Sequence, residues 1–254
     1  MSTEGAGFSL SGKTAVVTGA NTGIGQAIAV ALSRAGARVV CAGRSPIDGT
    51  REMIGHDHAG VLSITADLST PGDHARIVEE TLSWAGAVDI LVNNAGIIRR
   101  NDAIDFTEED WDAVVDTNLK SAFFLSQAVA REMIPRGSGK IINIASLLSF
   151  QGGIRVASYT ASKSGLAGLT KLLANEWAGK GINVNAIAPG YVATNNTEAL
   201  RNDPERYKAI LDRIPAGRWA QPSDIAGAAV FLASPAADYV HGITLPVDGG
   251  WLAR

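Results

Sequence analysis

A tyrosine and a lysine stand four residues apart in the segment SFQGGIRVASYTASK, which covers residues 149–163. On a helix, this spacing places the phenol of Tyr159 on the same face as the ammonium of Lys163. A phenol with an ordinary pKa of about 10 is a poor base at neutral pH, but a neighbouring cation lowers that pKa. We therefore predict that Tyr159 exchanges a proton with an alcohol or a ketone, and that Lys163 activates it.

The run before this segment places a hydroxyl and a second cation nearby. Residues 140–146, KIINIAS, predict a strand whose carboxyl end carries Ser146, and ligands bind at such ends in parallel sheets. Arg155 stands four residues before Tyr159, but a glycine pair precedes it. We therefore expect the helix to start near Ser158 and the arginine to lie on the loop that leads into it.

A glycine-rich turn, TGANTGIG, follows the first predicted strand and contains Gly19, Gly23 and Gly25. Such a turn lets the backbone approach a pyrophosphate, and the N-terminus of the following helix favours the negative charge. The spacing is GxxxGxG rather than GxGxxG. It indicates a nucleotide site, with an ordinary strand–helix turn as the alternative.

The end of the second predicted strand bears on which dinucleotide binds. An acid at this position hydrogen-bonds the ribose 2′-hydroxyl, whereas an arginine accommodates a 2′-phosphate. In RVVCAGRS, Gly43 occupies the position of the acid and Arg44 follows. Because a guanidinium binds phosphate in fork geometry, the sequence favours NADP over NAD, with a solvated surface arginine as the alternative.

The elements that must position these residues alternate regularly along the chain. Short β-branched runs and longer amphipathic runs predict one α/β domain over residues 1–254, a doubly wound parallel sheet of about seven strands with helices on both faces. We expect the first six strands to be apolar on both faces, as strands covered by helices on both sides are. The polar segment 194–213 follows the sixth strand, and we expect it to form a substrate lid. The predicted strands are 14–18, 38–42, 61–65, 90–94, 140–144, 183–187 and 244–247, and the predicted helices are 23–35, 71–84, 107–133, 158–179 and 222–233.

The composition excludes several other classes of protein. Hydrophobic residues make up 46% of the 254 residues and the net charge is −3, so we expect a substantial core and neither nucleic acid nor membrane as a partner. The single cysteine, Cys41, cannot form an internal disulfide, and the N-terminus lacks a secretory pattern, so we expect the cytoplasm. The HDH triplet at 56–58 has no accompanying ligands, so we expect no metal site.

The motifs, in their order, resemble those of the classical short-chain dehydrogenases/reductases. Besides TGANTGIG and YTASK, the matching segments are ADL, NNAG, NLK, NIAS and PGYVAT, and together they cover nearly the whole chain. The resemblance implies a Rossmann fold and a nicotinamide-dependent oxidoreductase of alcohols and ketones. It also implies that Tyr159 is the general acid/base and that Ser146 binds the substrate oxygen. Lys163 would bind the nicotinamide ribose and lower the tyrosine pKa, and Asn118 would support a water-linked proton relay.

The family pattern and the glycine turn together predict the residues that contact the cofactor. The chain departs from many NADP-preferring members because Asn21 and Thr22 stand where those members carry a basic residue. NAD therefore stays open as the alternative cofactor. The predicted contacts are Gly19, Asn21, Thr22, Gly23, Ile24, Gly25, Arg44, Asp67, Leu68, Asn94, Ala95, Gly96, Tyr159, Lys163, Pro189, Gly190, Val192 and Thr194.

Longer segments, including NNAGIIRR, INVNAIAPGYVATNN and VDGGWLAR, resemble the 2-dehydro-3-deoxy-gluconate dehydrogenases and the gluconate 5-dehydrogenases. The resemblance implies a sugar-acid substrate. A guanidinium binds a carboxylate bidentately, so we predict that Arg155, Arg99 or Arg100 grips it, with Arg155 favoured. The alternative is that these arginines pair with acids such as Asp102 or Asp105. The candidates for binding the substrate hydroxyls are Gln151, Asn195 and Asn196.

Two other functions share parts of this pattern. A 3-oxoacyl thioester reductase has the same core motifs, but its acidic carrier protein needs a basic docking patch. A non-catalytic dinucleotide sensor would not need Asn118, Ser146, Tyr159 and Lys163 together. The family resemblance also implies a homotetramer.

Overall fold

A computed structural model describes residues 6–55, 60–70 and 72–254, and shows a seven-stranded parallel sheet. The strand order is β3-β2-β1-β4-β5-β6-β7, so the chain winds outward in both directions from β1. This confirms the predicted doubly wound sheet, whose order reverses between β1 and β4, where such folds bind ligands. The strands are β1 (Thr14–Thr18), β2 (Arg38–Gly43), β3 (Val61–Thr65), β4 (Ile90–Asn93), β5 (Gly139–Ile144), β6 (Ile182–Pro189) and β7 (Thr244–Val247).

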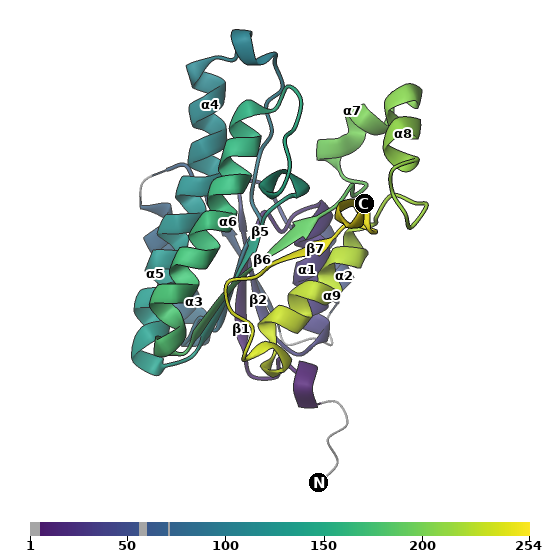
Figure 1. The fold of residues 1–254 in the computed structure, drawn as a ribbon. Helices are drawn as coiled ribbons and strands as arrows, with labels where there is room; N and C mark the ends of the chain where they lie inside the picture. The colour runs from purple at the N-terminus through teal and green to yellow at the C-terminus, as the bar shows by residue number, and fades with distance from the viewer. Residues whose placement is uncertain (1–5, 56–59, 71) are drawn as a thin grey trace.

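Helices cover both faces of the sheet (Figure 1). On one face lie α1 (Gly23–Arg34), α2 (Asp48–Ile54) and α9 (Pro222–Ala233). On the other lie α3 (Asp73–Ala85), α4 (Glu108–Val115), α5 (Ser121–Arg136) and α6 (Ala157–Trp177). The sequence analysis missed α2, a single short helix of seven residues.

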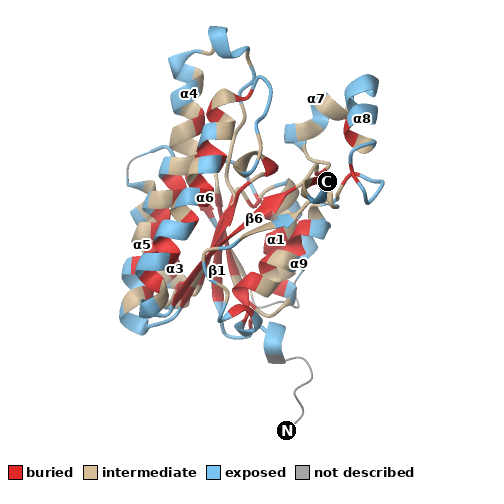
Figure 2. Ribbon diagram, viewed as in Figure 1, coloured by how far each residue is buried: buried red, intermediate tan, exposed pale blue. Residues whose placement is uncertain are grey.

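The core is divided by the sheet into two apolar layers (Figure 2). On β1, Val17 packs with the α1 and α9 side chains, whereas its neighbour Val16 packs with those of α3, α5 and α6. This follows from the strand period of two, which sends successive side chains to opposite faces. Because side chains on both faces of the central strands are buried in these layers, the sequences of these strands are continuously hydrophobic.

Two predictions about the elements were wrong in part. β3 is not apolar on both faces, because Ser63 and Thr65 are exposed at the edge of the sheet. The expected helix over 107–133 is divided into α4 and α5 by a π turn over Asp116–Lys120. Such single π turns insert one extra residue per turn and occur often at functional sites.

The predicted lid segment, residues 194–213, contains α7 (Glu198–Arg201) and α8 (Pro204–Leu211). Both helices stand beyond the carboxyl ends of the strands, beside the C-terminus (Figure 1). In the part of the chain that the structure describes, no helix is long and apolar enough to cross a membrane, and no group of acids, histidines and cysteines could hold a metal ion. The HDH triplet at 56–58 lies outside the described residues.

Candidate active site

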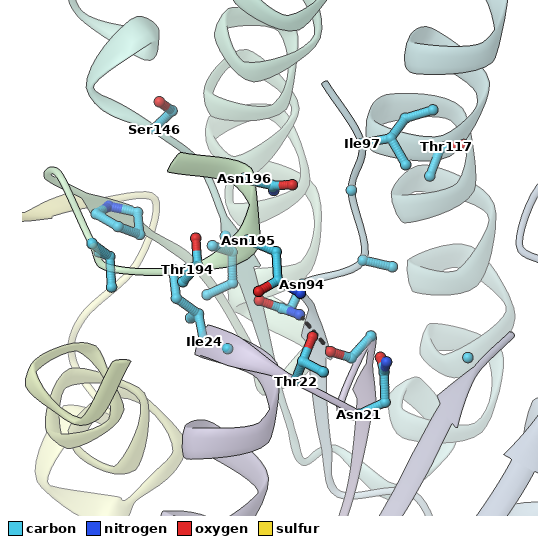
Figure 3. Close-up of a pocket in the computed structure, with 18 of the residues that line it drawn as sticks. Asn21, Thr22, Ile24, Asn94, Ile97, Thr117, Ser146, Thr194, Asn195 and Asn196 are labelled. Atoms are coloured by element: carbon cyan, nitrogen blue, oxygen red, sulfur yellow. Dashed lines mark hydrogen bonds between the residues drawn. The ribbon is translucent and has the colours of Figure 1, made fainter. Parts of the chain in front are cut away.

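A cavity runs along the carboxyl ends of the strands, from β2 and β3 to β5 and β6 (Figure 3). The predicted site residues that line it are Gly19, Asn21, Thr22, Gly23, Ile24, Arg44, Asp67, Leu68, Asn94, Ala95, Gly96, Ser146, Tyr159, Lys163, Pro189, Gly190, Val192, Thr194, Asn195 and Asn196. Its wall does not include Gly25, Asn118, Arg99, Arg100, Arg155 or Gln151. Gly43, which the sequence analysis placed at the cofactor-selecting position without naming it as a contact, also lines the cavity. Sequence analysis missed the lining residues Ser45, Ala66, Ile97, Thr117, Ile144, Ala145 and Thr197, most of which adjoin the motifs at the strand ends.

The glycine turn is held close to the end of β1. Gly19 has φ +63°, a left-handed conformation that favours glycine, and a side chain on Gly25 would collide with the Gly19 carbonyl. Asn94, the residue after β4, supports the turn, because its amide nitrogen donates to the Thr18 carbonyl at 2.9 Å and the Gly19 carbonyl at 3.2 Å. The turn therefore holds its backbone close to the cavity at the N-terminus of α1, where Asn21, Thr22 and Ile24 also line the wall.

The helix α2, which the sequence analysis missed, supports the same turn from the outside. The Thr50 hydroxyl is buried and donates to the Ala20 carbonyl at 2.7 Å. Gln26 donates to the Asn21 carbonyl at 3.3 Å and to the Thr50 hydroxyl at 3.1 Å. The two Thr50 contacts join residues 30 and 24 positions apart in the sequence, so the local pattern carries no signal of them.

Where the cavity passes the carboxyl end of β2, Arg44 lines it. Gly43 stands at the position where an acid would repel a 2′-phosphate. Arg44 is exposed and, among the described residues, forms no ion pair. Asp67 accepts hydrogen bonds from the Ser69 hydroxyl at 2.7 Å and the Ser69 N–H at 3.0 Å, and these bonds, aided by the Arg44 charge, lower its carboxyl pKa. The residues present fit a dinucleotide with a 2′-phosphate: a glycine cradle at one place and a free guanidinium at another.

Lys163 is buried, with 4% of its surface exposed, and its ammonium donates to the Ile144 carbonyl at 2.6 Å. Burial lowers its pKa from 10.5 to about 8, because the charged form loses its water. The ammonium lies 5.7 Å from the centre of the Tyr159 ring. The lysine is thus close to the tyrosine, as the spacing predicted, but its hydrogen bond goes to β5.

The predicted lowering of the tyrosine pKa differs from what the structure shows. Burial raises the pKa of Tyr159, and the opposing effects come from a hydrogen bond with Ser146 and from the charge of Arg100. Burial is the larger effect, so the net shift is upward. Arg100 is thus a second cation whose charge reaches the phenol, besides Lys163 at 5.7 Å from the ring centre.

Ser146 follows β5 and starts a short turn that packs on α6. Its hydroxyl accepts a hydrogen bond from the Leu148 N–H at 3.2 Å. The turn is tied to α6 because Ser149 donates to the Lys163 carbonyl at 2.7 Å and Ser164 donates to the Leu148 carbonyl at 3.0 Å. These contacts hold the serine hydroxyl beside Tyr159.

Asn118 lies in the π turn and is 1% exposed. Its side chain accepts from the Ile97 N–H at 2.8 Å and donates to the Ile97 carbonyl at 2.9 Å. The same amide donates to the Ser162 hydroxyl at 3.3 Å, which in turn donates to the Tyr159 carbonyl at 2.9 Å. Asn118 therefore joins the loop after β4 to the helix that carries Tyr159, so its side chain is committed to protein partners.

The three candidate arginines have different partners. Arg155 pairs with Asp102 at 3.1 Å and Arg99 pairs with Asp110 at 3.1 Å, so both guanidinium groups have a carboxylate partner. Arg155 also has φ +64°, a left-handed conformation unusual for arginine. Arg100 instead donates to the Asn196 carbonyl of the lid segment at 2.8 Å, and its charge acts on Tyr159. Neither Arg100 nor Arg155 lines the cavity, but the charge of Arg100, unlike that of the favoured Arg155, acts on Tyr159.

The three residues predicted to bind the substrate hydroxyls differ in their position relative to the cavity. Asn195 and Asn196 line the cavity, and Figure 3 shows both on the segment that passes across it. Gln151 lies outside the cavity, and its side-chain oxygen accepts a hydrogen bond from the Trp251 indole at 3.1 Å.

Comparison with known proteins agrees with this geometry. A family model described as enoyl-(acyl carrier protein) reductase matches residues 19–252. A 2-dehydro-3-deoxy-D-gluconate 5-dehydrogenase of Dickeya dadantii is 60% identical over 248 residues, which cover 97% of this chain and 98% of that protein. The chain belongs to the short-chain dehydrogenase/reductase family, and its close relatives are dehydrogenases that act on CH–OH groups.

Two solved structures resemble it over almost their full length. One, from Agrobacterium tumefaciens, is provisionally described as a 2-deoxy-D-gluconate 3-dehydrogenase with bound NADP. It is 63% identical in sequence and has a TM-score of 0.91, and the match covers 97% of this chain and 99% of that one. The other, a gluconate 5-dehydrogenase from Burkholderia cenocepacia in complex with NADP and tartrate, is 40% identical, has a TM-score of 0.93, and the match covers 98% and 99% of the two chains.

Proposed function

We propose that this enzyme transfers a hydride between a nicotinamide dinucleotide and a secondary alcohol or ketone of a sugar acid. The observation that carries the proposal is a single cavity with the glycine turn and Arg44 in one part and Ser146, Tyr159 and Lys163 in another. The substrate class is supported by the description of the 60% identical relative and by the tartrate, a hydroxy acid, in the Burkholderia structure.

Under this proposal the residues of the chain handle the proton. When bound, the nicotinamide supplies or accepts the hydride at the substrate carbon. Tyr159 donates a proton to the ketone oxygen, or accepts one from the alcohol, and Ser146 hydrogen-bonds that same oxygen. With a pKa of about 8, Lys163 is mostly protonated at pH 7 and can donate to ribose hydroxyls. Asn118 acts by holding the helix of Tyr159 against the loop after β4.

For the cofactor we propose a preference for NADP over NAD. The support is Arg44, which lines the cavity without an ion pair among the described residues, and Gly43, which stands where an acid would repel a 2′-phosphate. The NADP in both similar solved structures agrees with this preference.

For the substrate carboxylate we propose a place beside Arg100. Arg99 and Arg155 each have an acidic partner, whereas Arg100 bonds only to a backbone carbonyl of the lid segment among the described residues. A carboxylate is a stronger acceptor than a neutral carbonyl, so a sugar acid can take over this guanidinium. Asn195 and Asn196 are then the nearest candidates for the substrate hydroxyls.

The test is a panel of hexonates, deoxy-ketohexonates, their neutral sugar analogues and a 3-oxoacyl thioester, each assayed with both cofactors by the absorbance of the reduced nicotinamide. We expect turnover of at least one sugar acid with a clear advantage over its neutral analogue. Activity confined to the thioester would contradict the proposal and favour the acyl reductase. We also propose the homotetramer and the cytoplasmic location that the family suggests; light scattering would test the first, with a mass four times 26.4 kDa expected.

A further inference from the structure

The C-terminal turn, Trp251–Ala253, lies between the lid segment and the turn that follows Ser146, Leu147–Ser149. Trp251 is 3% exposed and packs in an apolar cluster with Leu147, Ile210, Ile214 and Trp219. Leu147 directly follows Ser146, whereas Ile210 belongs to α8 of the lid segment. The cluster that contains Trp251 therefore joins the lid segment to the turn that follows Ser146.

Trp251 is also hydrogen-bonded to the serine turn. Its indole nitrogen donates to the side-chain oxygen of Gln151 at 3.1 Å. An indole N–H can only donate, so this bond also fixes which way the glutamine amide faces. Gln151 closes the turn, because its own N–H donates to the Leu147 carbonyl at 3.1 Å. With Ser149 and Ser164 holding the opposite side to α6, the turn that presents Ser146 is held from two directions.

The tryptophan is in turn attached to the end of the lid segment. The Arg213 guanidinium lies 3.9 Å from the centre of the Trp251 ring, within the range of a cation–π contact. Nearby, Arg254 donates to the Asp212 carbonyl at 2.7 Å, and the Ala216 N–H donates to the Gly249 carbonyl at 3.0 Å. The C-terminal turn is therefore attached to the end of the lid segment by three separate contacts.

We propose that Trp251 is a positioning residue: its hydrogen bond to Gln151 holds the turn that carries Ser146 and couples that turn to the substrate lid. The inference rests on the proposed function, which assigns Ser146 to the substrate oxygen. A group that stabilises a reacting oxygen must be held to a fraction of an ångström by its supporting contacts, and this bond is such a support.

The experiment compares Trp251→Phe, Gln151→Leu and the double variant with a matched control, Trp219→Phe. The phenylalanine at 251 keeps an aromatic ring against Tyr191 and Arg213 but removes the donor. Trp219 is 6% exposed in the same cluster, and its indole nitrogen has no hydrogen-bond partner among the described residues. Its replacement therefore reproduces the loss of ring size without the loss of a bond.

We expect each single variant at 251 or 151 to lower kcat about fivefold, the size of one hydrogen bond, with cofactor affinity unchanged. The double variant should lose no more than either single one, because both remove the same bond. Since Ser146 lowers the pKa of Tyr159, the pH profile of alcohol oxidation should shift to higher pH in these variants and not in Trp219→Phe. Wild-type kcat in both single variants, additive losses, or an equal loss in the control would overturn the proposal.

Hydrogen–deuterium exchange gives a readout that does not depend on substrate. We expect faster exchange of the amides of residues 147–151 in Trp251→Phe and Gln151→Leu, and wild-type exchange there in Trp219→Phe. Unchanged exchange in the first two variants would also overturn the proposal. If the wild type turned over no sugar acid, the proposed function would fail, while the exchange data would still test the coupling.

Discussion

Lys163→Met should abolish activity and yet make the cofactor-free protein more stable at pH 7. Burial lowers the pKa of Lys163 from 10.5 to about 8, and each pKa unit corresponds to about 1.4 kcal/mol. Keeping this lysine charged in the folded protein thus costs on the order of 3 kcal/mol. Methionine fills a similar volume without charge, but leaves the Ile144 carbonyl without the lysine, which offsets about 1 kcal/mol. We expect a net gain of about 2 kcal/mol.

The gain should depend on pH in a defined window. Between about pH 8 and 10.5 the unfolded chain holds the Lys163 proton and the folded chain does not, so wild-type stability rises with pH across this range. Below pH 8 the cost is fully present. The advantage of Lys163→Met should therefore be largest below pH 8 and shrink as the pH approaches 10.5.

Urea unfolding followed by tryptophan fluorescence, at one protein concentration and at pH 7 and 9.5, measures both effects. Lys171→Met is the matched control, because Lys171 is an exposed lysine on the same helix. Its stability difference from wild type should be small and the same at both pH values. A Lys163→Met protein less stable than wild type at pH 7, or a gap that does not change with pH, would refute the reasoning.

Three further predictions concern the cavity. Tyr159→Phe should lower kcat by about 10²–10⁴-fold while cofactor affinity, measured by fluorescence titration, is kept; near-normal turnover would remove Tyr159 from the chemistry. Arg44→Ala should weaken the binding of NADPH relative to that of NADH by roughly one to two decades, and an unchanged ratio of the two dissociation constants would exclude Arg44. The control is Arg51→Ala, which should leave that ratio unchanged because Arg51 is an exposed arginine of α2 that does not line the cavity. Arg100→Ala should bring KM for a sugar acid close to that for its neutral analogue, whereas Arg155→Ala should leave the difference intact; the reverse result would restore the original preference for Arg155.

The sequence by itself determined the parts that depend on neighbouring residues. All seven strands were predicted within about two residues, because β-branched runs and strand–helix alternation are local patterns. The glycine turn, Ser146 and the Tyr159–Lys163 pair were placed at one edge of the sheet for a related reason. In a parallel sheet, every carboxyl end lies on the same side, so strand order along the chain already brings these motifs together.

Tertiary structure alone decided which polar groups pair with which. Nothing local to Arg155 shows that Asp102, rather than a substrate, receives its guanidinium. The acceptor of Lys163, the Ile144 carbonyl, is 19 residues away, and Gln151 and Trp251 are separated by 100 residues. Asn118, in the π turn between α4 and α5, likewise bonds to Ile97 and Ser162, which are 21 and 44 residues away. Hydrogen bonds and desolvation act over a few ångströms in space, and only the packed fold sets those distances.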